Sequence, residues 1–425
     1  PLSEQPTRSD DGPLLTRPVI GWCLYDWANS AFPTVISTFV FAAYFTRGVA
    51  PDETTGTLLW GNATSISALL VALMSAPLGA IADQTGRRKP WLAALTAITI
   101  LATLSLWGVL PDDAFITRAL VLVVIATVAF EFASVFYNAM LPEIASPRVM
   151  GRISGIGWGL GYAGGVVCLA VSLFVLVQAD PPPFGLDPET QEPVRATVLL
   201  VAAWFAVFSL PIFLMVPERA TPPRDGPKTS MAAAVRGGLS ELWRTLRALD
   251  LKSPVVRFLI ARMFYADGLT TLFTFGGIYA AGTFGMPFAE IILFGIALNV
   301  TAGLGAVGFG WIDDWIGPKR AITWALVGLI GFGVLALAAP NAFWFWIAGM
   351  ALGIFMGPTQ AASRTLMARL APPENRAEMF GLYALSGKAT NFAGPLVFAW
   401  TTALFDSQRA GMATIKCERS SSKAT

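Results

Sequence analysis

Long apolar segments separated by short polar loops dominate the 425-residue chain. Leu, Ala, Val, Ile, Phe and Gly fill each segment on all faces, unlike the one-sided apolar stripe of a surface helix. A helix needs about 20 mostly apolar residues to cross a bilayer. The pattern therefore predicts an all-α polytopic membrane protein with eleven spanning helices, at residues 19–46, 58–82, 91–110, 116–141, 153–178, 195–216, 254–281, 287–312, 321–340, 343–369 and 379–404.

The longest polar interruption, residues 217–253, separates six of these helices from five. We therefore expect a six-helix bundle over residues 1–216, a cytoplasmic linker over 217–253 and a five-helix bundle over 254–404, followed by a polar tail over 405–425. Apolar residues from Val235 to Leu249 share one stripe of a helix in the linker, beside several arginines. This pattern is typical of an amphipathic helix at the membrane interface, and a solvated linker helix is the alternative.

The two halves of the chain repeat each other at an offset of about 230 residues. Residues 79–89 read GAIADQTGRRK, and residues 310–320 read GWIDDWIGPKR. A second match, between 141–151 and 371–381, has almost the same offset, which indicates duplication of a six-helix unit. The second half is then one helix short, and basic residues in its tail would lie on the outer side. We expect the chain to depart from the repeat after about Ala410, with the twelfth helix missing.

Lys and Arg are distributed unequally between the two sides of the predicted helices. Twenty of them fall on the side of the N-terminus and the central loop, and three fall on the other side. Cytoplasmic loops carry the excess of basic residues in membrane proteins. The distribution therefore places the N-terminus and the central loop in the cytoplasm, for a multi-pass protein of the cell (inner) membrane.

The composition agrees with a membrane protein, with 55% hydrophobic and 13% charged residues. The net charge of +2 indicates no nucleic-acid partner. The absence of histidine excludes Ser-His-Asp catalysis and histidine-ligated zinc, and the three cysteines form no CxxC pair. No Gly-x-x-x-x-Gly-Lys motif is present, which disfavours ATP-driven transport. We expect no enzyme activity, no cofactor and no metal.

Ionisable side chains inside the predicted helices cost about 2.5–3.5 kcal/mol each at the helix centre, so each needs a partner, a water-filled cavity or a role. Asp26 and Asn29 share one polar face of the first helix. A place in a solute cavity and a capping role near the cytoplasmic end are both open for Asp26. Glu131 and Asn138 share a face of the fourth helix. A proton or solute site and a structural, paired carboxylate are both open for Glu131.

The second half carries a similar set. Asp267 lies deep in the seventh helix, and Gln360 and Arg364 form a polar cluster near the cytoplasmic end of the tenth. Solute contact and positive-inside anchoring both account for Arg364. Lys388 is the deepest cation of the chain, with Asn391 almost one turn further along the eleventh helix.

Lys388 and Glu131 each lie about ten residues, or about 15 Å, from the cytoplasmic ends of their helices. An ion pair costs less than two isolated charges at that depth. We therefore predict a pair between Glu131 and Lys388, with Asp267 as the second choice of partner.

The repeated loop segments each combine a carboxylate, a glycine turn and basic residues. A carboxylate there can accept charge-assisted hydrogen bonds and hold one conformer closed, although a static anchor is the alternative. The predicted gating residues are Gly79, Asp83, Gly86, Arg87, Arg88, Asp314, Gly317, Lys319 and Arg320.

A glycine series in the fifth predicted helix contains a superficial dinucleotide fingerprint, which we reject because no strand precedes it. Gly157, Gly161 and Gly165 recur at every fourth position. This spacing predicts close packing against another helix.

The loop motif Gly-x-x-x-Asp-x-x-Gly-Arg-Arg-Lys at 79–89 resembles that of the major facilitator superfamily. Five further strings resemble its bacterial branch related to vacuolar amino-acid effluxers of the autophagy-related type, and the resemblance covers nearly the whole chain. It implies twelve helices, alternating access and a midplane cavity between the halves. Two of the strings add Tyr137 and Tyr265 to the candidate solute and coupling residues. The five strings are YDWANSAF at 25–32, FYNAMLPEIA at 136–145, GRISGIGWGLGYAGG at 151–165, ARMFYADGL at 261–269 and FGLYALSGKATNFAGP at 380–395.

These observations predict a monomeric secondary active transporter whose partners are a small polar solute, protons and the lipid bilayer. Amino-acid efflux is what the resemblance implies, and the intramembrane carboxylates Asp26, Glu131 and Asp267 are candidates for proton coupling. A drug or metabolite efflux carrier of the same fold and a non-transporting membrane receptor or scaffold are the alternatives.

Overall fold

Every regular element in the part of the chain that the structure describes is a helix. The structure is a computed structural model that describes residues 14–218, 231–248, 250, 252–390 and 401. Nine described helices are long and apolar enough to cross a membrane. They correspond to the first six predicted spans and to the eighth, ninth and tenth. The helices of the first half are α1 (Arg17–Asn29), η1 (Phe32–Phe39), α2 (Phe41–Tyr44), η2 (Phe45–Val49), α3 (Glu53–Thr85), α4 (Lys89–Ser105), η3 (Leu106–Gly108), η4 (Asp113–Phe115), α5 (Ile116–Ala139), α6 (Leu141–Ile144), α7 (Met150–Val171), η5 (Ser172–Val177), η6 (Pro183–Gly185) and α8 (Glu192–Met215).

The helices of the second half follow the linker helix α9 (Met231–Ala248). The seventh predicted span corresponds to α10. The eleventh begins in α14 and continues beyond the described residues, where the tail and the question of a twelfth helix also lie. The second half contains α10 (Pro254–Phe284), α11 (Phe288–Ile316), α12 (Pro318–Ala338), α13 (Ala342–Leu370) and α14 (Arg376–Lys388).

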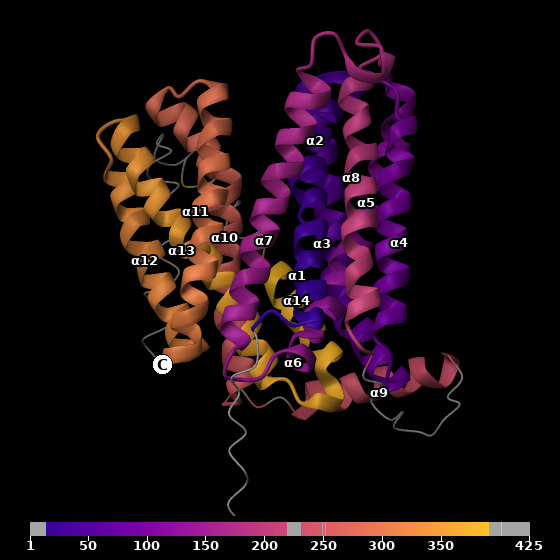
Figure 1. Cartoon of the computed structure of the whole chain (residues 1–425), viewed down its shortest axis with the longest axis vertical. Coiled ribbons are helices and arrows are strands. Elements are labelled where there is room, and N and C mark those ends of the chain that lie inside the picture. The colour runs from indigo at the N-terminus through magenta and orange to yellow at the C-terminus, as the bar shows by residue number, and fades with distance from the viewer. Residues whose placement is uncertain (1–13, 219–230, 249, 251, 391–400, 402–425) are drawn as a thin grey trace, which may run out of the picture.

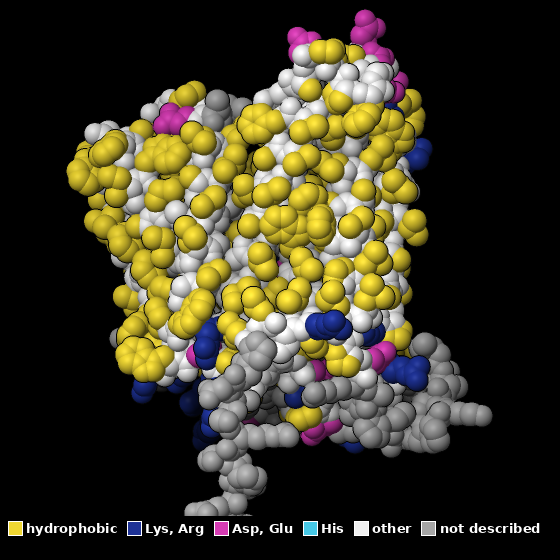
Figure 2. Space-filling model, in the orientation of Figure 1, with side chains coloured by type: hydrophobic (Ala, Val, Ile, Leu, Met, Phe, Trp, Pro, Cys, Tyr) yellow, Lys and Arg dark blue, Asp and Glu magenta, His cyan; other side chains and the backbone are white. Residues whose placement is uncertain are grey.

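The two halves form two groups of helices, α1 to α8 in indigo to pink and α10 to α13 in orange (Figure 1). Their most extensive contacts are between α3 and α14 and between α7 and α11. α6, α9 and the first turns of α7 and α14 lie at one end of the molecule, the lower end in Figure 1, which we call the α6 end. On the face shown in Figure 2, hydrophobic side chains cover most of the height of both groups, and Lys and Arg gather mainly toward the α6 end.

Small residues allow the halves to approach closely. A Cβ atom on Gly79 of α3 would collide with the Ala377 carbonyl of α14, and one on Gly155 of α7 would collide with the Ala306 carbonyl of α11. The two helix pairs, α3 with α14 and α7 with α11, correspond to each other in the internal repeat. Close backbone approach through glycine is how membrane helices pack where no side chain fits between them.

The predicted packing role of the α7 glycines is confirmed. A Cβ atom on Gly161 would lie 2.8 Å from the Ser30 hydroxyl, and one on Gly165 would lie 2.6 Å from the Thr34 hydroxyl. Both partners lie on the first membrane-spanning segment. α7 therefore rests directly on this segment, which brings Asp26 beside the second half.

Local chemistry explains the helix ends nearest the loops. Asp52 caps α3, since its carboxylate accepts a hydrogen bond from the Thr55 backbone N–H at 2.9 Å. The Thr55 hydroxyl also donates to it, and these bonds lower the pKa of Asp52. At the other end of α3, Gly86 has φ 66°, which stops the helix and reverses the chain as predicted. Gly317, with φ 87°, separates α11 from α12.

The predicted linker helix is present as α9, and it packs against α3. A Cβ atom on Gly238 would lie 2.7 Å from the Ile81 backbone nitrogen, so α9 touches the α3 backbone. Val235, Leu239 and Trp243 remain exposed. The helix thus has one face on the protein and one apolar face away from it.

Candidate functional site

Arg364 of α13 is the most enclosed basic side chain of the described residues, with 2% of its surface exposed. Its hydrogen-bond acceptors among the described residues all lie in the first half. It donates to the Asp26 carboxylate at 3.0 Å, to the Ser154 hydroxyl at 3.0 Å and to the Ser154 carbonyl at 2.7 Å. A longer contact of 3.4 Å reaches the Asn138 side-chain oxygen. The guanidinium therefore joins the halves through α1, α5 and α7.

Three aromatic rings of the first half surround the same guanidinium. Its carbon lies 4.5 Å from the Trp22 ring centre, 5.7 Å from that of Tyr137 and 5.5 Å from that of Trp158. These distances are within the range of cation–π attraction. The Trp22 indole N–H also donates to the Tyr137 carbonyl at 3.0 Å, and the two rings stack. We call Trp22, Tyr137, Trp158 and Asp26 the Arg364 cage.

Two further hydrogen bonds join α13 to α7 beside the cage. The Gln360 amide donates to the Tyr162 hydroxyl at 3.0 Å. The Ser154 hydroxyl donates to the Ala361 carbonyl at 2.8 Å. Tyr265, by contrast, shares a hydrogen bond of 2.6 Å with Ser363 inside the second half.

The predicted ion pair between Glu131 and Lys388 is confirmed as a contact. The Glu131 carboxylate oxygen lies 2.8 Å from the Lys388 nitrogen, and the side chains are 23% and 29% exposed. Asp267, the second choice of partner, lies on α10 and is only 2% exposed. Asn391 lies outside the described residues.

At the α6 end, Asp83 of α3 binds the N-terminus of α14. Its carboxylate accepts hydrogen bonds from the backbone N–H groups of Ala377 at 3.2 Å and of Glu378 at 2.8 Å. Arg88 lies 3.3 Å from Asp83 and also pairs with Glu143 of α6. A helix N-terminus carries unsatisfied N–H groups and partial positive charge, so it favours a carboxylate.

Asp314 of α11 binds the N-terminus of α7 in the same way. It accepts hydrogen bonds from the backbone N–H groups of Gly151 at 2.7 Å and of Arg152 at 3.1 Å. The Arg152 side chain adds a bond of 2.7 Å, and Arg369 of α13 approaches to 3.8 Å. Asp83 and Asp314 thus tie each half to the other through equivalent contacts of the repeat.

The predicted charge-assisted hydrogen bonds are present at both carboxylates, from Arg88 to Asp83 and from Arg152 to Asp314. Lys319 and Arg320 are exposed, as is Arg87. The physical reason is that α12 starts at Pro318, directly after the Gly317 turn, so the two basic residues belong to its first turn and face away. The basic side chain that hydrogen-bonds to Asp314 is Arg152, which belongs to the other half.

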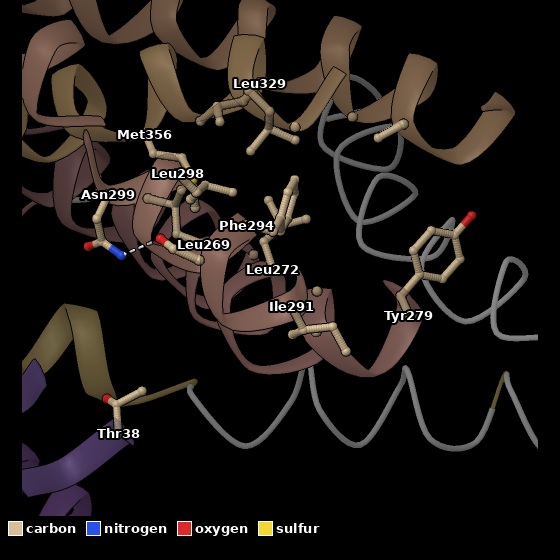
Figure 3. A pocket seen from close by; sticks show the side chains of 18 of the residues that line it. Thr38, Leu269, Leu272, Tyr279, Ile291, Phe294, Leu298, Asn299, Leu329 and Met356 are labelled. Carbon is tan, nitrogen blue, oxygen red and sulfur yellow. Dashed lines mark hydrogen bonds between the residues drawn. The ribbon is translucent and has the colours of Figure 1, made fainter. Parts of the chain in front are cut away.

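A cavity of ≈1020 Å³ lies between the second half and η1. Most of its lining is apolar, from α10 to α13, and the polar residues include Thr38, Tyr265 and Asn299. Figure 3 shows Leu269, Leu298 and Met356 grouped near Asn299, with Thr38 facing them from the first half. Ser37, which also lines the cavity, lies eleven positions after Asp26, or about 16 Å along a helix. The cavity therefore lies beyond the cage, away from the α6 end.

The described lining differs from the helices expected from sequence. The candidate solute residues lie on the first, fourth, seventh, tenth and eleventh predicted helices, whereas the described lining comes from the first predicted helix, from α10 to α13 and from Trp60 of α3. The fourth predicted helix, α5, contributes no described lining residue because its polar residues face the cage and Lys388 instead. Among the candidate solute residues, the described lining includes Tyr265.

Several residues of the site were missed by sequence reasoning. Trp22 and Trp158 look like apolar residues of the helix core, and nothing in their spacing distinguishes them from other core residues. Ser154 and Glu143 lie inside two of the strings that carry the family resemblance, GRISGIGWGLGYAGG and FYNAMLPEIA. Those strings were the one available signal.

Comparison with known proteins matches a family model described as vacuole effluxer Atg22 like over residues 61–150 and 145–416. The chain is 27% identical over 396 residues to the uncharacterized MFS-type transporter YxiO of Bacillus subtilis, covering 92% of this chain and 89% of that protein. It is 26% identical to autophagy-related protein 22-1 of Penicillium rubens, covering 59% of this chain and 44% of that one.

Solved structures show the same fold. The proton:xylose symporter XylE matches with a TM-score of 0.71 at 14% identity, covering 94% of this chain and 92% of that one. The human organic anion transporter MFSD10 matches with a TM-score of 0.70 at 14% identity, covering 94% and 95%.

Proposed function

We propose, from the premise that this chain belongs to the Atg22-like vacuole effluxer family, that it is a secondary active transporter of a small polar solute. The chain is a multi-pass membrane protein with the major-facilitator fold. It would work by alternating access, with the two halves rocking about the Arg364 cage. In this proposal the two moving parts are the bundles before and after the linker at residues 217–253.

The observation that carries the proposal is the ion pair between Asp26 and Arg364, which joins the halves at 3.0 Å. The halves are tied together at this level and at the α6 end, and they are separated by the cavity further along. When the halves rock, the contacts at the cage and at the α6 end must therefore break and other contacts between the halves must form. Removing one partner of a buried ion pair is strongly unfavourable, so two discrete states follow more readily than a continuous motion.

The proposed solute is an amino acid, and the proposed direction is efflux across the cell membrane with the α6 end in the cytoplasm. The family membership and the relatives named autophagy-related protein 22 support this. The basic residues that gather toward the α6 end support the orientation.

The proposed coupling ion is the proton, bound at Glu131. Its partner Lys388 lies in the other half, so protonation of Glu131 would release one contact between the halves. Asp267 is the second candidate because it is an almost fully buried carboxylate of α10. Either carboxylate would make the exchange of conformers depend on the proton gradient.

The apolar lining of the cavity favours a second candidate function, efflux of a drug or another apolar metabolite. Leu272, Phe294 and Leu329 contribute to a lining with few polar groups. An apolar solute would bind there by burial of its surface.

One experiment separates these functions. Purified protein is heated with amino acids, sugars and apolar drugs in turn, and uptake of every stabilising compound is then measured in proteoliposomes. Amino acids should raise the unfolding temperature and be transported. Stabilisation and transport of apolar drugs alone would establish the second candidate. Binding without transport of any compound would indicate a receptor or scaffold and would contradict both transport proposals.

A further inference from the structure

The Arg364 cage is a complete binding site for a cation. Every component belongs to the first half: a carboxylate from Asp26 and three ring faces from Trp22, Tyr137 and Trp158. Aromatic faces around a carboxylate are the surroundings that ammonium and guanidinium groups prefer. In this conformer the second half fills the site with its own cation, Arg364.

The same contact is a carboxylate site when it is viewed from the second half. The Arg364 guanidinium presents a planar fork of N–H donors, which is suited to a carboxylate. The Asp26 carboxylate accepts from one of these donors, Nη1, at 3.0 Å, while Nε and Nη2 donate to Ser154. When the halves separate at this level, the cation site loses its cation and the anion site loses its anion in one step. Two unpaired charges at this depth are costly, so both sites need replacement partners.

We propose that the solute is a zwitterion whose two charged groups replace the two halves of this ion pair. The proposal rests on the transport function given above. The solute ammonium would take the place of the guanidinium against Asp26 and the ring faces. The solute carboxylate would take the place of Asp26 at Arg364. An α-amino acid fits this requirement because both groups are attached to one carbon atom.

Charge balance explains why one charged group is not enough. The ion pair is neutral overall, and a zwitterion inserted between its members leaves every charge paired. A cation alone would satisfy Asp26 and leave Arg364 without a partner, and an anion alone would do the reverse. Selectivity for zwitterions follows from the penalty on whichever charge stays unpaired.

The pair also provides a means of release. When the halves close at the α6 end, Asp26 and Arg364 recombine, and the two groups of the solute lose their partners together. The cavity beyond the cage is then the space that remains, and its lining of residues such as Leu269, Phe294 and Met356 suits an apolar side chain. This order moves the solute from the α6 end toward the cavity, the direction proposed for efflux.

The test on the wild-type protein uses three compounds of nearly equal shape. L-leucine carries both charges, leucinamide carries only the ammonium, and 4-methylpentanoate carries only the carboxylate. Binding is measured by competition with radiolabelled leucine in detergent. We expect leucine to bind at least about tenfold more tightly than either analogue. Equal binding of either analogue would overturn the proposal.

Single variants then assign each charge to its site. Arg364→Gln should lose leucine binding and bind leucinamide directly, because the cage is vacated. Asp26→Asn should lose leucine binding and keep weak binding of 4-methylpentanoate. Unchanged leucine binding in both variants would contradict the assignment.

Arg262→Gln is the matched control. Arg262 lies 3.5 Å from the Tyr383 ring centre and donates to the Tyr383 carbonyl at 2.7 Å, so it is also an arginine held by an aromatic residue. Its described contacts remain within the second half. Leucine binding should change less than about twofold in this variant, because Asp26 and Arg364 are both unchanged. An equal loss in Arg262→Gln and Arg364→Gln would attribute the effect to folding and overturn the assignment.

Failure of this inference is distinguishable from failure of the transport proposal. A protein that transports an uncharged or singly charged solute, without preference for leucine over its analogues, would contradict the zwitterion site and leave transport intact. A protein that transports none of the compounds screened would contradict transport itself.

Discussion

The Glu131 carboxylate lies 2.8 Å from the Lys388 ammonium, although the two residues are 257 positions apart and belong to opposite halves. Both side chains are about one quarter exposed. The pair lies on α5 and α14, away from the cage contacts of α13. It is therefore a second, separate link between the halves.

Neutralising either member of this pair should abolish gradient-driven uptake in proteoliposomes, because the remaining charge stays within the membrane without a partner. Glu131→Gln and Lys388→Ala are the single variants. The exchange of Glu131→Lys with Lys388→Glu should restore part of the activity, since the attraction does not depend on which helix carries which sign.

The control for this exchange is the exposed pair Arg47–Glu53, whose side chains are 58% and 66% exposed. Arg47→Ala should leave uptake nearly unchanged, because exposed ion pairs contribute about 0–1 kcal/mol. Full activity of Lys388→Ala would end the idea of an essential pair.

Proton coupling has its own signature. If Glu131 binds the coupling proton, Glu131→Gln should lose gradient-driven transport and retain exchange of labelled for unlabelled solute, because exchange needs no net proton movement. Asp267→Asn tests the second candidate in the same assay. A dependence on pH that is the same in wild type and in both amide variants would exclude coupling through these groups.

The carboxylates Asp83 and Asp314 should hold the α6 end closed. Asp83→Asn removes the negative charge that lies at the N-terminus of α14, and Asp314→Asn removes the one at the N-terminus of α7. Each variant should shift the conformational equilibrium toward the state with the halves separated at the α6 end, by about 0.5–2 kcal/mol. The measurement is the distance between spin labels at the exposed positions Arg87 and Lys319, one in each half.

Asp52→Asn is the matched control for the gate. Asp52 caps α3 from the loop before it, within the first half. Loss of its charge should therefore leave the distance between the two spin labels unchanged. An identical distance distribution in wild type and in both gate variants would favour the static-anchor interpretation of Asp83 and Asp314.

Gly157 should be intolerant of a methyl group. A Cβ atom there would lie 2.7 Å from the Asp26 carboxylate and 3.0 Å from the Arg364 guanidinium. Gly157→Ala should therefore disturb the ion pair, cost about 1–3 kcal/mol and lower the unfolding temperature. Gly331→Ala is the control, because its Cβ would meet nothing within 4 Å. Equal unfolding temperatures for the two variants would show that the contact around Gly157 can relax.

The sequence alone determined the features that depend on position along a helix. Segment length identified the membrane-spanning helices, and Gly86 and Gly317 marked the reversals, because only the local backbone is involved. The pair of Glu131 and Lys388 was predictable for the same reason. Each residue of a helix adds about 1.5 Å, so distance in sequence converts directly into depth.

Tertiary structure decided which residues meet at a given depth. The sequence left Asp26 and Arg364 each with two interpretations, and it did not identify Arg152 as the basic partner of Asp314. The physical reason is that a spanning helix is apolar both where it faces lipid and where it packs against protein. Hydrophobic periodicity therefore says little about how such a helix is rotated. Its rotation and its neighbours follow from close contacts such as Gly79 on Ala377, which only the assembled bundle contains.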